Sequence, residues 1–366
     1  MLNTKPDKES EQNLPIDRQA PFQSPAYREN HLVIANERPE FGELREVVSG
    51  VYCLKMPIPF VLDHINLWLL KDVEGWVIID TGFYSEAAIS IWQKILNTLR
   101  MEGSIHKILV THFHPDHVGM AQWLIKQTSA DFLMSQQEFM AAQTAYNPLS
   151  DEQIGLRRTF LEQMGLSTDQ VSCLLKRKSG STENDRSIPD IYQCIEGGDE
   201  LQVNGESWTL YSFSGHSPEH ICLYNAQRKI LIAGDQVLPA ISPNISVSFT
   251  EPEADPLAGY LRSLSVLSTL DKEVLVLPAH GGVFTGLRER AKILIEGHRK
   301  DLDKVLVFCQ QTRNVKEVME EMFGDKLSIL NLFLASGEAL AHLNYLVAKG
   351  KIKRDKANVY RYTTLS

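Results

Sequence analysis

Cysteine is scarce in this sequence and does not follow the pattern of a disulfide framework or a zinc knuckle. The five cysteines are scattered over 366 residues, are odd in number and include no CxxC pair. Such usage is typical of a reducing compartment rather than of a secreted domain stabilised by disulfides. We interpret Cys222, in the apolar segment HICLYN, as a packing residue.

Long apolar runs and a targeting signal are also missing. No stretch of about 18 apolar residues occurs, so we expect no membrane span. The N-terminal segment MLNTKPDKESEQNLPIDRQAPFQSP is polar and lacks the apolar centre of a secretory signal. We therefore expect a cytoplasmic protein whose residues 1–30 form a flexible arm.

An excess of positive charge is the third missing feature. The chain has 37 Lys and Arg against 46 Asp and Glu, which gives a formal net charge of -9. This balance disfavours a protein that coats nucleic acid. The composition, 43% hydrophobic and 23% charged, is that of a globular protein, and the length suffices for one large domain or two ordinary ones.

Strand-like segments fall into two blocks that are interleaved with helical ones. Short runs rich in β-branched and aromatic residues occur at 51–59, 65–70, 76–80 and 107–112. A second block begins near residue 200, where Asn204-Gly205 carries a hairpin signal. This alternation predicts an α/β sandwich with sheets inside and helices outside.

Two further segments differ from this pattern. Residues 136–196 show helical periodicity and a polar loop, and we interpret them as a helical insertion between the strand-rich blocks. From residue 299 to residue 366 the pattern is again helical and then ends in KGKIKRDKANVYRYTT. Helices followed by a basic hairpin resemble a small winged-helix module.

The segment LVTHFHPDHVG carries the strongest chemical signal. It places His112, His114, Asp116 and His117 within six residues, at the end of an expected strand. Pro115 ends the strand, and the following loop can direct all four side chains to one place. Imidazole and carboxylate groups are zinc ligands, and these four groups suit half of a site for two ions.

Three downstream residues are candidates for the other half. His216, Asp235 and His280 each follow an apolar, strand-like run and lie beside glycine, where the backbone can turn. Any one of them alone is more simply an ordinary loop, turn or capping residue. Together with the first cluster, however, they place five of the eleven histidines at strand ends. We leave His220, which has an ambiguous context, outside the ligand set.

At these residues the chain resembles the metallo-β-lactamase superfamily. THFHPDHVG matches its T-H-x-H-x-D-H-x-G motif, and GHSPEH, AGDQ and PAHGG match its later motifs in order. VIIDTG matches its early strand-turn motif, and the resemblance covers about residues 45–300. Ser214 and Ala279 depart from the residues that many members carry, but neither departure removes a ligand.

The resemblance implies an αββα sandwich over residues 31–298, with residues 136–196 as a helical lid insertion and residues 299–366 as the winged-helix-like domain. It also implies a binuclear site with two divalent ions. We expect zinc, with iron or manganese as alternatives. One ion would be held by His112, His114 and His216, the other by Asp116, His117 and His280, with Asp235 as the bridge. Asp80 would order the histidine loop.

The mechanism implied for such a site is attack by a metal-bridging hydroxide, with Asp116 orienting it or moving its proton. The first substrate hypothesis is a small thioester, ester or lactone. Apolar residues of the insertion would then line an acyl site, although packing within helices is the simpler interpretation. These residues are Phe139, Met140, Tyr146, Phe160, Leu161 and Met164.

Other functions stay open. The family has a winged-helix-bearing branch of endoribonucleases, and the basic tail could contact phosphates or be a solvated hairpin. Its cations are Lys349, Lys351, Lys353, Arg354, Lys356 and Arg361. A mononuclear iron persulfide dioxygenase keeps the same motif residues. A non-catalytic regulator is disfavoured, because a structural zinc site needs only four ligands. A small-molecule substrate and no membrane partner are expected, nucleic acid is not favoured, and a homodimer is compatible with the sequence.

Overall fold

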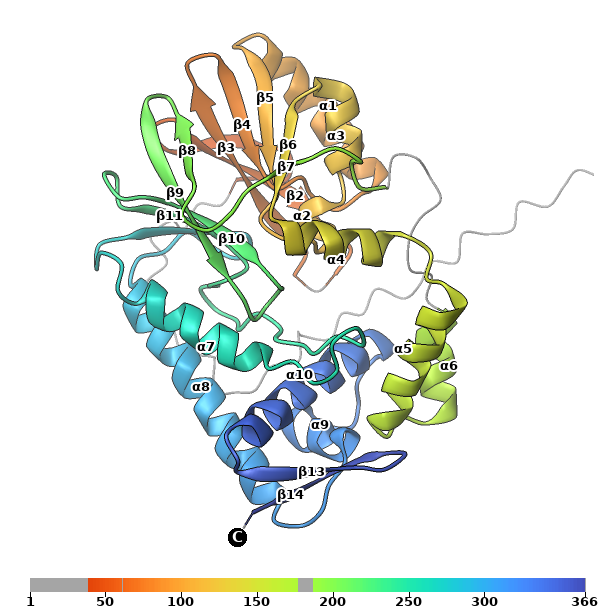
Figure 1. Cartoon of the computed structure of the whole chain (residues 1–366). Helices are drawn as coiled ribbons and strands as arrows, with labels where there is room; N and C mark the ends of the chain where they lie inside the picture. Colours follow the sequence, from red (N-terminus) through yellow and green to blue (C-terminus); the bar gives the residue numbers. More distant parts are fainter. Residues whose placement is uncertain (1–38, 61, 177–186, 366) are drawn as a thin grey trace, which may run out of the picture.

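Two packed sheets flanked by helices form the body of the protein in the computed structural model, which describes residues 39–60, 62–176 and 187–365 (Figure 1). Over these residues the first sheet has seven strands in sequence order. They are β1 (Leu44–Val48), β2 (Val51–Pro57), β3 (His64–Asp72), β4 (Gly75–Ile79), β5 (Ser104–Leu109), β6 (Asp131–Met134) and β7 (Gln193–Cys194). Strands β4 to β7 run parallel, so their carboxyl ends lie at one edge of the sheet.

The second sheet is largely antiparallel. Within the described ranges it has five strands, in the order β12-β11-β10-β9-β8. They are β8 (Glu200–Val203), β9 (Glu206–Phe213), β10 (His220–Asn225), β11 (Ile230–Gly234) and β12 (Leu275–Pro278). The predicted turn between β8 and β9 is confirmed, because Asn204 and Gly205 have φ angles of 52° and 74° and a two-residue type I′ turn requires positive φ at both positions.

Side chains alternate between two cores along the strands. In β3, Leu67 and Leu69 pack in the cluster that contains helix α1, while Trp68 and Leu70 pack in the cluster shared with the second sheet. Both faces of the strand are thus buried, as its near-continuous apolar run indicates. The same alternation along the other central strands produces the four-layer αββα arrangement predicted from the sequence.

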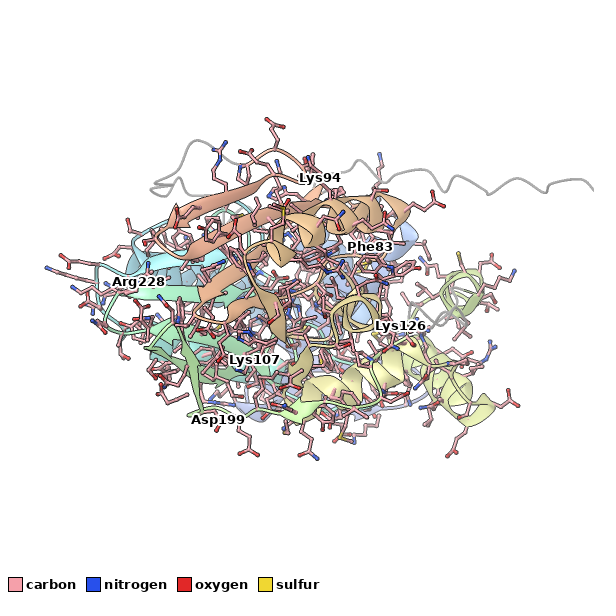
Figure 2. All side chains as sticks on the ribbon, turned by 90° about the horizontal axis from the view of Figure 1, so that it is seen from above. Phe83, Lys94, Lys107, Lys126, Asp199 and Arg228 are labelled. Atoms are coloured by element: carbon pink, nitrogen blue, oxygen red, sulfur yellow. The ribbon has the colours of Figure 1, made fainter. Side chains whose placement is uncertain are left out.

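Helices cover the outer faces of both sheets (Figure 1). On the first sheet lie α1 (Glu86–Arg100) and α3 (Ala121–Thr128), and on the second lie α7 (Pro256–Leu267) and α8 (Leu287–Phe308). Ser85 is the N-cap of α1, since its Oγ accepts a hydrogen bond from Ala88 N. Polar side chains such as Lys94 and Asp199 lie at the outer surface (Figure 2).

The insertion contains three helices among its described residues. They are α4 (Gln136–Tyr146), α5 (Asp151–Gln163) and α6 (Thr168–Lys176). Helices α5 and α6 lie beside the C-terminal helices rather than beside the sheet edge (Figure 1). Phe160, Leu161 and Met164 are buried in the core that they share with those helices. These three residues therefore pack, and the hypothesis that they line an acyl site is wrong.

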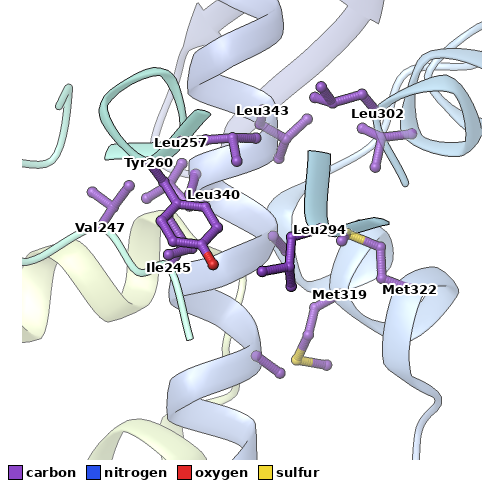
Figure 3. Close-up of a cluster of buried hydrophobic side chains, with 14 of the residues drawn as sticks. Ile245, Val247, Leu257, Tyr260, Leu294, Leu302, Met319, Met322, Leu340 and Leu343 are labelled. Carbon is purple, nitrogen blue, oxygen red and sulfur yellow. The ribbon is translucent and has the colours of Figure 1, made fainter. Parts of the chain in front are cut away.

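The C-terminal part continues this core. It comprises α9 (Val315–Phe323), α10 (Ile329–Ala348) and a hairpin of β13 (Ile352–Lys356) and β14 (Tyr360–Thr364). Leu340 and Leu343 of α10 pack among Leu257 and Tyr260 of α7 and Leu294 of α8 (Figure 3). The order of helices and hairpin is the one predicted from the sequence, and the comparison with a winged helix stays a prediction.

Two expectations on chain organisation have different outcomes. The flexible arm expected over residues 1–30 lies outside the described residues. The boundary placed between residues 298 and 299 falls inside α8, which runs without a break from Leu287 to Phe308.

Among the described residues, no helix combines the length and the apolar character needed to cross a membrane. Cys222 is fully buried, as expected of a packing residue.

Candidate metal centre

The histidine loop is held at the edge where the parallel strands β4 and β5 end. The Asp80 carboxylate, directly after β4, accepts hydrogen bonds from Thr111 N at 2.8 Å and lies 2.8 Å from His117 Nδ1. Asp80 itself has a φ of 65°, a strained conformation for a residue other than glycine. Pro115 then begins the short helix α2 (Pro115–Val118), which fixes the turn of the loop. Asp80 therefore orders the loop, as its sequence motif suggests.

A first group of four predicted ligands converges beside this loop. His112, His114, His216 and Asp235 each offer one ligand atom, and these atoms lie within 4.8 Å of one another. His112 Nε2 is 3.0 Å from His114 Nδ1 and 3.2 Å from His216 Nε2. Asp235 Oδ2 is 3.4 Å from His216 Nε2. Strand ends from both sheets thus contribute to one group.

A second group lies on the other side of Asp235. Asp116, His117 and His280 also offer ligand atoms within 4.8 Å of one another. Asp235 Oδ1 is 3.4 Å from His280 Nε2 and 3.6 Å from His117 Nε2. The two oxygens of Asp235 therefore face different groups. All seven residues predicted from the sequence lie together.

Main-chain carbonyls determine which ring nitrogen is left for a metal. His216 Nδ1 donates to the carbonyl oxygen of Asn244 at 2.8 Å, and His280 Nδ1 donates to that of His64 at 2.7 Å. Because a carbonyl can only accept, the proton is on Nδ1 in both rings. The Nε2 atom of each ring is then left facing the centre, where it offers a lone pair to a metal once the ring is neutral. Fixing the ring in this way is the usual role of such outer partners.

Burial and clustering of charges control protonation. Burial lowers the pKa of His112 well below its usual value, and it lowers the pKa of His114 to about 3; neighbouring histidines add to both effects. Burial alone would raise the pKa of Asp235, but the charges of His280 and His117 outweigh it, so this pKa lies well below its ordinary range. Burial also opposes the charged forms of His117 and His280, but the carboxylates around these rings outweigh it and raise the pKa of both above the usual value. Neutral imidazoles and ionised carboxylates are the forms that bind metal, so a metal would displace the protons of these two rings.

Two buried atoms at the middle of the centre have no hydrogen-bond partner: His117 Nε2 and Asp235 Oδ1. Leaving such atoms unpaired costs about 1–3 kcal/mol each. A cation between them would remove this cost by accepting both lone pairs. The donor set of imidazole nitrogens and carboxylate oxygens suits zinc, iron or manganese. The residues therefore fit a divalent metal.

His220 supports the centre from behind. It is fully buried, its Nε2 accepts a hydrogen bond from Asp235 N at 3.1 Å, and its ring stacks on His112 with 4.8 Å between centroids. Gly234 has a φ of 50°, and a Cβ there would lie 2.6 Å from the His220 ring. Burial lowers the pKa of His220, so the ring is neutral. This matches its place outside the predicted ligand set.

Three supporting residues were missed by the sequence analysis. His64 and Asn244 act through their carbonyl oxygens, which every residue possesses, so no sequence signal could identify them. The Asn244 side chain also donates to Glu338 Oε2 on α10 at 2.7 Å. Glu138 of α4 is fully buried and bonded to the loops on both sides of the centre. Its signal was the spacing Ser135-x-x-Glu138, which resembles a capping box.

The basic hairpin is largely engaged within the protein. Arg354 lies 2.9 Å from Glu253, and Lys356 is paired with the same carboxylate. Arg361 lies 3.5 Å from Glu317 on α9. Three of the six cations predicted as possible phosphate contacts are thus in ion pairs, which favours the interpretation as a solvated hairpin.

Family models match most of the chain. Residues 61–280 match the model described as metallo-β-lactamase superfamily, and this segment contains all seven predicted ligands. Residues 302–365 match the model described as metallo-β-lactamase-like, C-terminal domain.

Solved structures extend the similarity over nearly the whole chain. A β-lactamase domain protein from Burkholderia ambifaria is 35% identical with a TM-score of 0.82, and the match covers 92% of this chain and 98% of that one. A metallo-β-lactamase family protein from Thermus thermophilus is 26% identical with a TM-score of 0.73, covering 87% and 100%.

Curated relatives are more distant. A lactamase-like protein of Aspergillus fumigatus is 26% identical over 62% of this chain and 50% of its own length. An atrochrysone carboxyl ACP thioesterase of Cryptosporiopsis sp. is 23% identical over 50% and 41%. A hydroxyacylglutathione hydrolase of Chromohalobacter salexigens is 24% identical over 82% and 94%. The chain spans about half the length of the first of these relatives.

Proposed function

Because the chain belongs to the metallo-β-lactamase superfamily, we propose that it is a metal-dependent hydrolase with two adjacent divalent ions. One ion would be held by His112, His114 and His216, the other by Asp116, His117 and His280, with Asp235 placed between the two groups. The observation that carries the proposal is the orientation of Asp235, with Oδ2 3.4 Å from His216 Nε2 and Oδ1 3.4 Å from His280 Nε2. Zinc is the expected metal.

A pair of divalent ions supplies a hydroxide nucleophile at neutral pH and polarises a substrate oxygen. The chain contributes fixed geometry and one carboxylate with a catalytic role. Asp116 Oδ2 lies 3.2 Å from His280 Nε2. Burial opposes ionisation of Asp116, but the charge of His117 and the hydrogen bond from His280 lower its pKa to about 2. Asp116 is therefore ionised at neutral pH and can orient the nucleophile or accept its proton.

The substrate class we favour is a small thioester, ester or lactone. The ring of Phe113 packs edge-on against the ring of the candidate ligand His114, with 4.6 Å between centroids. The Tyr146 hydroxyl is buried without a hydrogen-bond partner. Burial raises its pKa, and the charge of Asp116 adds to this effect, so the hydroxyl stays protonated as a donor. An aromatic ring with one spare donor beside the centre suits an uncharged acyl group. Two relatives named as a thioesterase and a hydroxyacylglutathione hydrolase support the same class.

Metal analysis combined with turnover assays tests this proposal. We expect purified protein to contain about two zinc ions per chain and to hydrolyse small thioesters or lactones faster than RNA. His114→Ala should lose metal and activity. His106→Ala is the matched control, because His106 lies within β5, six residues before His112, and pairs with Asp72. Full metal content and activity in His114→Ala would refute the ligand assignment. One iron per chain with oxygen consumption would replace hydrolysis by the dioxygenase alternative.

A further inference from the structure

Helix α4 begins with the sequence pattern of a capping box, but it does not form the hydrogen bonds of one. In a capping box the glutamate at the third helical position returns to the N–H of the N-cap residue. Ser135 makes no side-chain capping bond, and its Oγ donates instead to the carbonyl oxygen of Glu219 at 2.9 Å. Helix α5 has the same spacing, and there Ser150 and Gln153 do close the box. The Glu138 side chain therefore does not cap its own helix.

The Glu138 carboxylate joins two loops that carry predicted ligands. Its Oε2 accepts a hydrogen bond from Phe113 N at 2.9 Å, and its Oε1 accepts from Ser217 Oγ at 2.5 Å and from Glu219 N at 2.7 Å. Phe113 lies between His112 and His114 in sequence, and Ser217 directly follows His216. A single side chain thus contacts both halves of the first ligand group.

The two loops come from different sheets, and a backbone hydrogen bond from Ile221 N to the carbonyl oxygen of Thr111 at 2.9 Å joins them at their base. One loop follows β5 in the first sheet, and the other joins β9 to β10 in the second. Glu138 is fully buried, and a buried carboxylate is costly unless it is hydrogen-bonded. All three bonds described above are made with these loops. The burial is thus compensated by contacts at the centre and not by contacts of the helix.

We propose that Glu138 is a positioning residue that holds the two loops at metal-binding spacing before any ion is present. This inference rests on the proposed metal centre and assigns a role to the first insertion helix. Without Glu138 the separation of His112 Nε2 and His216 Nε2, 3.2 Å here, would lose the side-chain link that joins the two loops, and the backbone bond between Ile221 and Thr111 would remain. Metal binding would then have to order both loops.

Zinc affinity of Glu138→Gln tests the proposal. The amide keeps the shape of the side chain but presents an NH2 group to donors that need an acceptor. We expect the zinc dissociation constant, measured by competition with a chromophoric chelator, to rise roughly 10–100-fold, as for other outer partners of metal ligands. The matched control is Glu317→Gln, which alters the capping glutamate of α9 and should leave zinc affinity unchanged.

Hydrogen exchange in the metal-free protein gives a second readout. The protection of the two loops would not change if Glu138 only stabilised helix α4. The amides of Phe113 and Glu219 should lose protection in Glu138→Gln, while the amides of α5 keep theirs. Ser217→Ala removes one of the three hydrogen bonds and leaves helix α4 unchanged. It is therefore the test variant if Glu138→Gln does not fold. We expect it to have a smaller effect, and the double variant should show less than the combined loss.

The outcomes separate this inference from the proposed function. If wild-type protein binds zinc and both variants bind it equally well with both amides protected, the positioning role is wrong and the metal centre stands. If the wild type itself has no measurable zinc affinity, the proposed function fails and takes the positioning role with it.

Discussion

Glu338 connects the C-terminal helix α10 to the candidate metal centre, and its titration gives the sharpest test of that connection. The residue is 8% exposed, and its Oε2 accepts a hydrogen bond from Asn244 Nδ2 at 2.7 Å. The carbonyl oxygen of Asn244 in turn holds His216. The pKa of Glu338 is raised from 4.5 to about 8. Burial is the main cause and nearby Asp301 adds to it, while the hydrogen bond from Asn244 opposes it.

The sign of the effect on stability follows from proton counting. Between pH 4.5 and pH 8 the folded protein keeps a proton on Glu338 that the unfolded chain has lost. The free energy of unfolding therefore falls as pH rises through this window. The pKa difference sets an upper limit of roughly 5 kcal/mol on the change. Glutamine cannot titrate, so Glu338→Gln should match the wild type near pH 5 and exceed its stability by roughly 2–4 kcal/mol near pH 8.5.

Urea unfolding of metal-free protein from pH 5 to pH 9 measures this difference. Other groups that face Glu338, namely Asp301, His298 and His342, are present in both proteins, so their titration largely cancels in the comparison. Glu296→Gln on the exposed side of α8 is the control and should follow the wild type at every pH. If the free energy of unfolding of Glu338→Gln and of the wild type depended on pH in the same way, the reasoning would be refuted. Glu338 would then not carry a proton in the folded protein at neutral pH.

Three further changes probe other parts of the structure. Asp80→Asn removes the charge beside His117 Nδ1 and should weaken zinc binding roughly 10–100-fold in chelator competition; unchanged affinity would contradict its ordering role. His114→Ala should reduce elemental zinc from about two ions to about one per chain and abolish hydrolysis, and retention of both ions would contradict the first ligand group. Leu340→Ala, at a fully buried position in Figure 3, should lower the free energy of unfolding by about 2–5 kcal/mol. Calorimetry should show one shifted transition, and a separate early transition would mean that the C-terminal part unfolds alone.

Local signals in the sequence predicted much of the fold. Helix α9 lies in the segment predicted as helical, and its bounds follow from local signals: Asn314 and Glu317 close a capping box at its start, and Gly324 follows its end. The β8–β9 turn formed as predicted because Asn204-Gly205 suits positive φ at both positions. The seven candidate ligands came together because motifs at strand ends identify residues whose position depends on the sheet edge.

Long-range packing was not predictable in the same way. Phe160 and Leu161 were expected in an apolar environment, but periodicity does not say which partner provides it, and the partner is the C-terminal core. The boundary at residues 298 and 299 was placed where the composition changes, whereas α8 continues through it. His64 and Asn244 support the centre through carbonyl oxygens, which leave no trace in residue type.

Helix α10 contacts the loop whose Asn244 carbonyl accepts a hydrogen bond from His216, so the C-terminal part is in contact with the surroundings of the candidate metal centre. Val247 N donates to the carbonyl oxygen of Gly337, and a Cβ on Gly337 would lie 2.8 Å from Ser246 Oγ. Glycine inside a helix costs about 0.5–1 kcal/mol relative to alanine, so its presence here follows from the close approach of the loop. Helix α10 therefore presses directly on the segment whose Asn244 carbonyl orients His216. The C-terminal part thus supports the orientation of a candidate ligand through Glu338 and Asn244.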